Sequence, residues 1–379
     1  MQMDYTADMV LRVAQRHRNE KRGYLLVNPL QGKHMPVPPH AALDMMAALG
    51  RRVAAQHPEA RLVIGFAETA TAIGGIVAEE ISPSCTYIQT TREKSAGVSR
   101  WIEFMEEHSH APEQRLAADA LEEALARTDT VVFVDDELST GRTLCNIIVQ
   151  MRAALPALCG KKLVAASLLN RLTEADTARL RAHGAESIAL LHLPEGDYEA
   201  RAAGIAAHAP EVCAPDAELP CRRLVLPSCR TPRAGVTIGD YVAHWREEGH
   251  RLAASLPWGA EERVLVLGTE ECMLPGLLIG RAVEERGAGA VFFHATTRSP
   301  IGIAAAEGYP IRAGWQLQSF YEAGRTTYIY NLEPYDHVLI VTDAEQAAED
   351  GVQSLLAALG RSGSTDIVCL TAGGCGRDE

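Results

Sequence analysis

Two adjacent acids, Asp135 and Asp136, follow four apolar residues and precede a turn rich in hydroxyl groups in the string VVFVDDELSTGRT. The apolar run predicts a buried strand, and open parallel sheets bind ligands at the carboxyl ends of their strands. Neighbouring side chains of a strand point to opposite faces, so the two carboxylates would reach different parts of one ligand. Adjacent anions raise each other's pKa unless hydroxyl donors or a cation accompany them, and a sugar diol with a divalent metal would supply both.

The turn after the acids predicts an anion site. Ser139, Thr140 and Thr143 bring hydroxyl groups, and the expected helix start brings unpaired backbone N–H groups and the positive end of the helix dipole. Gly141 permits close approach of the backbone to a ligand. Carboxylates that could bind a sugar, next to hydrogen-bond donors that could bind its phosphate, predict a ribose 5-phosphate site. The alternative is an ordinary strand-to-helix turn in which these side chains only cap the helix.

The elements that must position these residues alternate between short apolar runs and amphipathic stretches, which predicts an α/β class with a mostly parallel sheet flanked by helices. The strands expected in the first half of the chain are 61–66, 85–89, 130–134, 162–168 and 187–193. The helices expected there are 40–56, 70–80, 114–127, 142–155 and 174–183.

Three segments recur in order in the second half. RLVIGFAE (from Arg61) resembles RVLVLGTEE (from Arg263), YIQTTRE (from Tyr87) resembles FFHATTRSP (from Phe292), and VVFVDDE (from Val131) resembles VLIVTDAE (from Val338). The first two pairs are separated by similar distances, 25 residues from glycine to threonine in one half and 28 in the other. These repeats predict an internal duplication with one altered copy, although any α/β sheet could account for the first pair alone.

Length and composition limit the class of protein. A chain of 379 residues predicts about two domains, taken as 1–200 and 236–379 with a connecting segment at 201–235 that is rich in Pro, Cys and Ala. Lys and Arg number 36 against 49 Asp and Glu, a net charge of −13 that disfavours nucleic acid and anionic membranes. Nine scattered cysteines without a C-x-x-C pair and the lack of an apolar run of about 18 residues predict a cytoplasmic protein.

The acid-and-turn string resembles the phosphoribosyl-pyrophosphate (PRPP) signature of the type I phosphoribosyltransferases. The resemblance implies that Asp135 and Asp136 hold the ribose hydroxyls, directly or through Mg²⁺, which accompanies the pyrophosphate. It also implies that the following loop holds the 5-phosphate. The PRPP-binding residues implied for this stretch are Glu137, Leu138, Ser139, Thr140, Gly141, Arg142 and Thr143.

Two further segments fit the layout of this family. The turn Ala67-Glu68-Thr69-Ala70 lies where the family has its pyrophosphate loop. Arg92 and Lys94 resemble the cationic region of orotate phosphoribosyltransferases, which holds the leaving pyrophosphate, although the order of charges differs here.

Two segments outside these loops are candidates for contacts to the acceptor or to the leaving group. His108 and His110 lie in a long connection that would correspond to the catalytic loop, or they are ordinary surface residues. Asn28, Lys33 and His34 follow an N-terminal strand, where the family builds the hood that selects the base.

The second half resembles the TRSP domain, named for a tetrad that stands here as Thr297-Arg298-Ser299-Pro300. This domain follows a phosphoribosyltransferase domain in proteins linked to bacterial tellurite-resistance and stress gene clusters. The second copy lacks one acid and the phosphate turn, so it is a degenerate copy that should not bind PRPP in the same way. Its Glu270, Glu271, Arg298 and Ser299 form a candidate site, or remain only for packing.

These resemblances imply a Mg²⁺-dependent enzyme that transfers phosphoribose from PRPP to a nucleobase-like acceptor, releases pyrophosphate and contributes to a nucleoside-like metabolite. The sequence does not determine the oligomeric state, for which a homodimer is one candidate. The alternative is a PRPP-sensing regulator that acts through protein contacts without turnover. A response-regulator receiver domain is a weaker alternative, because it leaves the Ser-Thr-Gly-Arg-Thr turn unexplained.

Overall fold

The fold is taken from a computed structural model, which describes residues 4–17, 22–93, 95, 98–104, 114–193, 196–214, 219–256, 258–287 and 289–372. The chain divides into two compact units, each built from separate stretches. Unit 1 comprises 1–5, 43–195 and 230–244, and unit 2 comprises 6–42, 196–229 and 245–379. Two of the boundaries, after residues 42 and 244, fall within long helices, α2 (Pro39–Gln56) and α8 (Ile238–Ser255).

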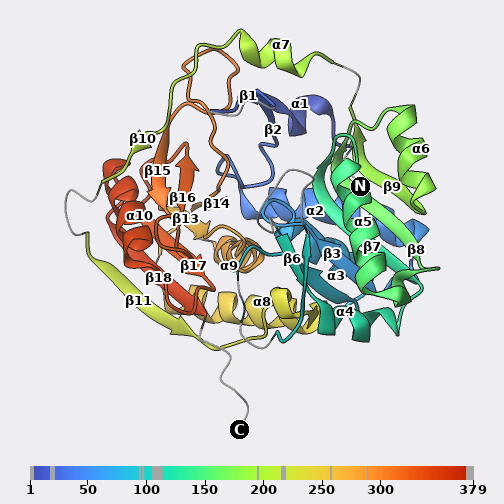
Figure 1. The fold of residues 1–379 in the computed structure, drawn as a ribbon. Helices are drawn as coiled ribbons and strands as arrows, with labels where there is room; N and C mark the ends of the chain where they lie inside the picture. Colours follow the sequence, from blue (N-terminus) through green and yellow to red (C-terminus); the bar gives the residue numbers. More distant parts are fainter. Residues whose placement is uncertain are drawn as a thin grey trace. The chain divides into compact units, whose positions relative to one another are not determined.

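The core of unit 1 is a six-stranded sheet in the order β12-β4-β3-β7-β8-β9, in which only β12 is antiparallel to its neighbour. Strands β3, β7, β8 and β9 of this sheet are labelled in Figure 1. Each central strand is apolar and buried on both faces, as expected of a parallel sheet covered by helices. The strands are β3 (Leu62–Gly65), β4 (Thr86–Gln89), β7 (Thr130–Leu138), β8 (Lys162–Asn170), β9 (Ala185–His192) and β12 (Val236–Thr237).

Helix α3 (Thr71–Ile81) connects β3 to β4 and packs closely on both. A Cβ at Gly74 would lie 2.9 Å from the Cα of Gly65 and 2.9 Å from the ring of Tyr87, so the absence of a side chain sets this packing distance. The other helices that lie wholly within unit 1 are α4 (Ala118–Leu125), α5 (Arg142–Ala154) and α6 (Glu174–Ala182), with a 3₁₀ turn at Pro156–Leu158 and another at Pro232–Ala234.

Unit 2 contains a five-stranded, fully parallel sheet in the order β11-β18-β17-β13-β14. Read from the other edge, β14-β13-β17-β18 repeats the order β4-β3-β7-β8 of unit 1, as an internal duplication requires. The elements are β11 (Cys221–Leu226), β13 (Arg263–Gly268), β14 (Ala290–Ala295), β17 (His337–Thr342), β18 (Asp366–Ala372), α9 (Leu274–Glu285) and α10 (Glu349–Arg361).

Each unit also inserts an antiparallel hairpin at the same point of the fold. Unit 1 has β5 (Trp101–Phe104) with β6 (Gln114–Ala117), and unit 2 has β15 (Gly314–Gln318) with β16 (Thr326–Tyr330). Isolated bridges join Thr91 to Arg115 of β6 and Thr297 to Tyr328 of β16. The confirmed α/β class and these matching insertions support a second domain that is an altered copy of the first.

The N-terminal hairpin of β1 (Arg12–Gln15) and β2 (Tyr24–Val27) belongs to unit 2. Its apolar side chains share a core cluster with Ile301, Ile303 and Tyr330. The remaining short elements of unit 2 are α1 (Ala7–Val10), α7 (Tyr198–Ala203) and β10 (Glu211–Val212), which pairs with β15.

Most expected elements of the first half are present within a few residues, and two differ. The expected helix 114–127 begins as strand β6 and becomes helical only at Ala118, because Gln114–Ala117 pair with β5. Strand β7 extends to Leu138 instead of ending at Val134, because Asp135, Glu137 and Leu138 continue the ladder with β8.

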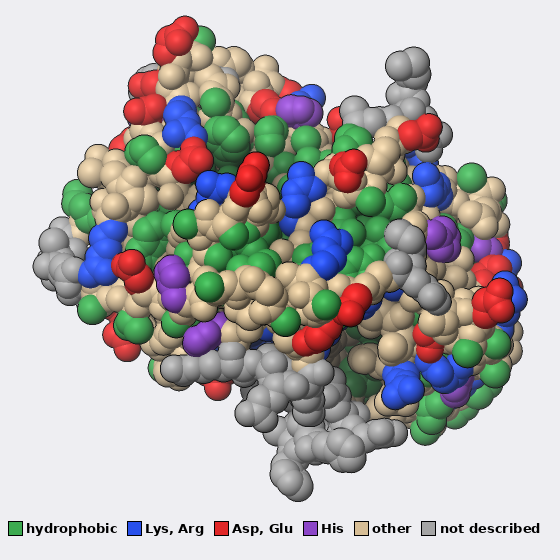
Figure 2. Space-filling model, turned by 90° about the horizontal axis from the view of Figure 1, so that it is seen from above, with side chains coloured by type: hydrophobic (Ala, Val, Ile, Leu, Met, Phe, Trp, Pro, Cys, Tyr) green, Lys and Arg blue, Asp and Glu red, His purple; other side chains and the backbone are tan. Residues whose placement is uncertain are grey.

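The described surface carries charges of both signs. On the face drawn in Figure 2, Lys and Arg side chains are interspersed with Asp and Glu and do not gather into one basic surface. Among the described residues, no helix has the length and apolar character needed to cross a bilayer.

Candidate active site

The acid pair lies in the last residues of β7, at the carboxyl end of the unit 1 sheet. Asp135 pairs in register with Ser167 of β8, and both acids are partly exposed. The backbone N–H of Asp136 donates to a carboxylate oxygen of Asp135 at 2.9 Å. This bond holds the carboxylate of Asp135 at the end of the strand, the position that parallel sheets use for ligands.

Desolvation raises the pKa of Asp135 well above its ordinary value, and the neighbouring charge of Asp136 raises it further. Desolvation also raises the pKa of Asp136, with repulsion from Glu137 adding to it, while the hydroxyl of Thr69 opposes the shift. The pair is a site at which added hydroxyl donors or a cation would stabilise the ionised form.

Glu137, the third acid of the run, is neutralised by the protein itself. Arg171, directly after β8, places Nε 2.9 Å and Nη2 2.7 Å from one carboxylate oxygen of Glu137. Both side chains are largely buried, at 16% and 11% exposure. Glu137 therefore forms a structural ion pair, whereas Asp135 and Asp136 are partly exposed at the end of the strand.

The loop after β7 leads directly into α5. Gly141 is the N-cap with a φ of 66°, and no side chain caps the helix. The first N–H groups of a helix have no partner within it, so they point toward the region in front of α5. Thr140 and Thr143 are exposed beside them, and Nη2 of Arg179 donates to the carbonyl of Thr140 at 2.8 Å, which anchors the loop.

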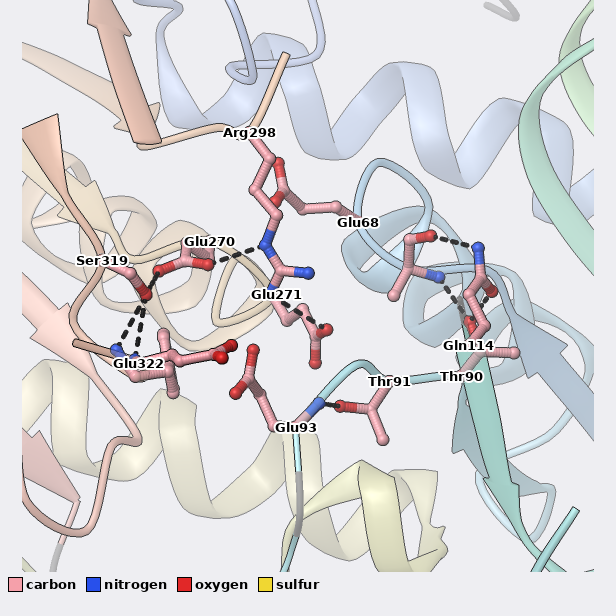
Figure 3. Close-up of polar contacts among 12 residues, drawn as sticks. Glu68, Thr90, Thr91, Glu93, Gln114, Glu270, Glu271, Arg298, Ser319 and Glu322 are labelled. Atoms are coloured by element: carbon pink, nitrogen blue, oxygen red, sulfur yellow. Dashed lines mark hydrogen bonds and ion pairs between the residues drawn. The ribbon is translucent and has the colours of Figure 1, made fainter. Parts of the chain in front are cut away.

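The loop after β3 meets the acid pair. The hydroxyl of Thr69 donates to a carboxylate oxygen of Asp136 at 3.0 Å. The N–H of Ala67 donates to the hydroxyl of Thr90 at 2.7 Å, and Gln114 joins the two by accepting from Thr90 and donating to the carbonyl of Ala67 (Figure 3). The peptide bond from Ala67 to Glu68 is cis, and Ala70 begins the turn into α3.

The cationic candidates are described only in part. Arg92 is exposed and follows Thr91, whose hydroxyl accepts from the N–H of Glu93 at 2.9 Å (Figure 3). Lys94, His108 and His110 lie outside the described residues.

The three residues expected to contact the acceptor lie in unit 2 with the N-terminal hairpin. Asn28 accepts the N–H of Leu30 with its side-chain oxygen, and His34 is buried. Lys33 is fully buried, and its Nζ donates to the carbonyls of Glu270 and Thr296, both at 2.9 Å.

Unit 2 brings its candidate residues together around the end of β13. Nε of Arg298 lies 2.8 Å from a carboxylate oxygen of Glu270, and Nη2 lies 3.8 Å from one of Glu271 (Figure 3). Both glutamate side chains are 1% exposed. Ser299 uses its N–H to bond the hydroxyl of Thr297 at 3.2 Å, which shapes the turn behind Arg298.

Several residues of these networks were missed by the sequence analysis. Their types are ordinary and their partners lie far away in the chain, so no local pattern marks them. They are Gln114, Arg171 and Arg179 in unit 1, and Ser319, Tyr321 and Arg325 in unit 2.

Asp135 and Asp136 fit a divalent cation only as part of a shared site. Among the described residues, no group of three or more His, Cys, Asp or Glu side chains is placed to hold a metal. Mg²⁺ prefers six oxygen ligands and is commonly held by one or two carboxylates together with waters and substrate phosphates. The pair therefore suits Mg²⁺ that arrives with a phosphorylated ligand.

Comparison with solved structures gives weak likenesses at low identity. Orotate phosphoribosyltransferase from Aeropyrum pernix is 19% identical, with 41% of this chain and 73% of that chain covered and a TM-score of 0.28. Adenine phosphoribosyltransferase from Giardia lamblia, complexed with 9-deazaadenine, is 15% identical (50% and 97% covered, TM-score 0.32). The Trypanosoma brucei enzyme, in complex with AMP, pyrophosphate and ribose-5-phosphate, is 14% identical (48% and 76% covered, TM-score 0.34).

The assignment of the chain to a protein family rests on family models and not on these structural likenesses. No match was found among curated proteins. The model of the phosphoribosyl transferase family matches residues 10–196, and the model of the TRSP domain, which lies C-terminal to that family, matches residues 231–359. By these matches, residues 10–196, which contain the acid pair and the turn at 139–143, belong to the phosphoribosyl transferase family, and residues 231–359 belong to the TRSP domain.

Proposed function

We propose that unit 1 transfers phosphoribose from PRPP to a nitrogen of a nucleobase-like acceptor with release of pyrophosphate, as a step toward a nucleoside-like metabolite. The observation that carries the proposal is that Asp135, Asp136 and Thr69 meet at the carboxyl end of β7, and that the chain then leads directly to the helix start at Gly141. The carboxylates can accept hydrogen bonds from the ribose hydroxyls of PRPP, and the backbone N–H groups at the helix start can donate to its 5-phosphate.

In the proposed reaction the bond from ribose C1 to pyrophosphate breaks, and pyrophosphate leaves with the electron pair. The acceptor nitrogen bonds to C1 and releases its proton to solvent. Negative charge grows on the leaving group, so the backbone after Ala67 and the cation Arg92 are the groups we assign to stabilise it. Thr69 orients Asp136 through its hydrogen bond, which leaves the remaining carboxylate oxygens for the ribose hydroxyls.

We assign Asp135 and Asp136 to hold Mg²⁺, directly or through water and ligand oxygens. The ion would neutralise part of the pyrophosphate charge. Two adjacent, partly exposed carboxylates at the end of a strand support this assignment, because desolvation raises their pKa values and a neighbouring cation would stabilise their ionised forms.

Replacing both acids tests the site. In Asp135→Asn with Asp136→Asn we expect PRPP affinity to fall about 10- to 100-fold, because hydrogen bonds to charged groups contribute about 1.5–3 kcal/mol. Calorimetric titration with PRPP and Mg²⁺ measures the loss. The matched control is Asp343→Asn, which changes the corresponding acid of unit 2 and should leave PRPP affinity unchanged. Unaltered affinity in the double variant would disprove the assignment.

Turnover is tested separately by incubating the protein with PRPP, Mg²⁺ and a panel of bases while pyrophosphate is measured. Release that depends on one base identifies the acceptor. Tight PRPP binding with no release across a broad panel would contradict transfer and favour the PRPP-sensing regulator.

We also propose that the protein acts in the cytoplasm and that 201–235 connects the two family segments. Free thiols at Cys85, Cys145, Cys159 and Cys369 support a reducing compartment. The family matches end at 196 and resume at 231, which supports the connection.

A further inference from the structure

The same hydrogen-bonding pattern occurs separately at the strand ends of each unit. The N–H of Ala67 donates to the hydroxyl of Thr90 at 2.7 Å, and the N–H of Glu270 donates to the hydroxyl of Thr296 at 2.9 Å. Ala67 of unit 1 and Glu270 of unit 2 therefore occupy the same position of the fold. A methyl group in one copy is replaced by a carboxylate in the other.

The carboxylate of Glu270 lies in a site built for an oxyanion. One oxygen is 2.8 Å from Nε of Arg298 and 3.2 Å from Nη2 of Arg325, and the other accepts the hydroxyl of Ser319 at 2.6 Å (Figure 3). Glu270 is 1% exposed, while the two arginines are 11% and 17% exposed. Two guanidinium groups and a hydroxyl around one group are typical of phosphate and carboxylate recognition.

One of these cations also has a counterpart in unit 1. Arg298 follows Thr296 and Thr297 as Arg92 follows Thr90 and Thr91, and both Thr-Thr pairs bridge to the second strand of the inserted hairpin. Arg92 is exposed, whereas Arg298 is turned onto Glu270.

The other ligand positions of unit 2 are also taken by its own hairpin. In front of α10, the N–H of Ala348 donates to the carbonyl of Phe320 at 2.9 Å, and a Cβ at Gly351 would lie 2.3 Å from the carbonyl of Ser319. The hydroxyl of Tyr321 donates to Asp343 at 2.6 Å, where Asp136 stands in unit 1. Backbone carbonyls of the hairpin thus cover the start of α10, and the hydroxyl of Tyr321 occupies Asp343. The carboxylate of Glu270 occupies the two arginines.

We propose that unit 2 contains a latent site for phosphate or pyrophosphate at Arg298, Arg325 and Ser319, which the carboxylate of Glu270 occupies in the native chain. Glu270 acts as an internal anionic ligand, so this site is closed to other oxyanions in the native protein. The proposal rests on contacts within unit 2 and does not depend on transfer activity in unit 1.

Removal of the internal ligand should open the site. Glu270 has a φ of 47°, a region that glycine adopts freely, so Glu270→Gly removes the carboxylate without opposing the backbone. We expect this variant to bind one more pyrophosphate per chain than the native protein in calorimetric titration. Its melting temperature should rise with pyrophosphate by more than that of the native protein, because the ligand would replace the carboxylate contacts that Arg298 and Arg325 lose in the variant. Arg325 also has an ion pair with Glu322 at 2.8 Å, which the substitution does not remove.

The matched control is Glu270→Gly with Arg325→Ala, which should return to the native stoichiometry. Unit 1 has the same sequence in all three proteins, so its own pyrophosphate binding cancels and a failure of the proposed function would not alter the comparison. A folded Glu270→Gly protein with native stoichiometry, or an extra site that survives in the control, would overturn the proposal. If Glu270→Gly unfolds in buffer, recovery of folded protein only with pyrophosphate supports it, and no recovery refutes it.

Discussion

The charge of Glu137 in β7 is neutralised by Arg171. Nη2 and Nε of Arg171 lie 2.7 and 2.9 Å from one carboxylate oxygen of Glu137. In Arg171→Ala we expect unfolding free energy to fall by about 2–3 kcal/mol, because a largely buried carboxylate loses its cation. Urea unfolding measures this change.

The double variant Arg171→Ala with Glu137→Gln separates charge from packing. It removes the uncompensated anion and should recover more than half of the lost stability. No recovery would mean that Arg171 stabilises β8 through its aliphatic stem alone.

At the residue level, the sequence predicted groups that act through local spacing. Asp135, Asp136 and Gly141 lie on one strand-turn-helix segment, so their arrangement follows from periodicity and turn chemistry. Gln114 and Arg171 are 24 and 34 residues from their partners Thr90 and Glu137. Such pairs depend on which strands become neighbours, which one sequence does not reveal.

Among the elements, α5 depends on its N-cap residue, Gly141. Gly141 has a φ of 66°, and a Cβ there would meet only a methyl group of Leu172 at 3.4 Å. Gly141→Ala should therefore cost about 1–2 kcal/mol through backbone conformation and not through a clash, and it should weaken PRPP binding by displacing the N–H groups in front of the helix. Thermal unfolding and PRPP titration measure the two effects.

Gly160→Ala is the matched control for this substitution. Gly160 has a φ of 83° with no atom within 4 Å of the position of a Cβ, and it lies outside the phosphate turn. It should lose similar stability and keep native PRPP affinity. Equal loss of affinity in both variants would show that Gly141 acts only through global stability.

The elements that the sequence predicted well are those with long periodic patterns, such as α2 and α5. The hairpin strands β5 and β6 were missed because each has four residues, too few for an alternating pattern to be distinguished from the start of a helix. The length of β7 was underestimated because its last residues are acids, which are disfavoured in strands but here continue the ladder with β8.

For the whole molecule, His294 makes stability depend on pH. Its ring nitrogens lie 3.0 Å from the carbonyl of Gly32 and 2.8 Å from that of Tyr330. Burial lowers the pKa of His294 from 6.5 to about 4, with repulsion from Lys33 adding to it and the two carbonyls opposing it. The unfolded chain then binds the proton more readily, so stability is full above pH 6.5 and declines as the pH falls toward 4.

This difference corresponds to about 3 kcal/mol over that window. Urea unfolding of the native protein and of His294→Gln between pH 4 and 7 measures it. The variant should lack this part of the pH slope, and parallel curves would contradict the role of His294.

The duplication is the whole-molecule feature that the sequence predicted best, because three paired segments in the same order correspond to strands in the same order. The division of the chain into these two units could not be predicted from the sequence to the same degree. Residues 6–42 join unit 2, and 230–244 join unit 1, through contacts between segments that are distant in the chain and share no pattern.

This interleaving has a consequence for synthesis on the ribosome. Val27 of the N-terminal hairpin shares its core cluster with Ile301, which is added 274 residues later. At about 5–20 residues per second, the nascent hairpin waits roughly 14 to 55 seconds for this partner. Throughout that interval its apolar side chains are available to chaperones or to neighbouring nascent chains, so translation speed becomes a determinant of the yield of folded protein.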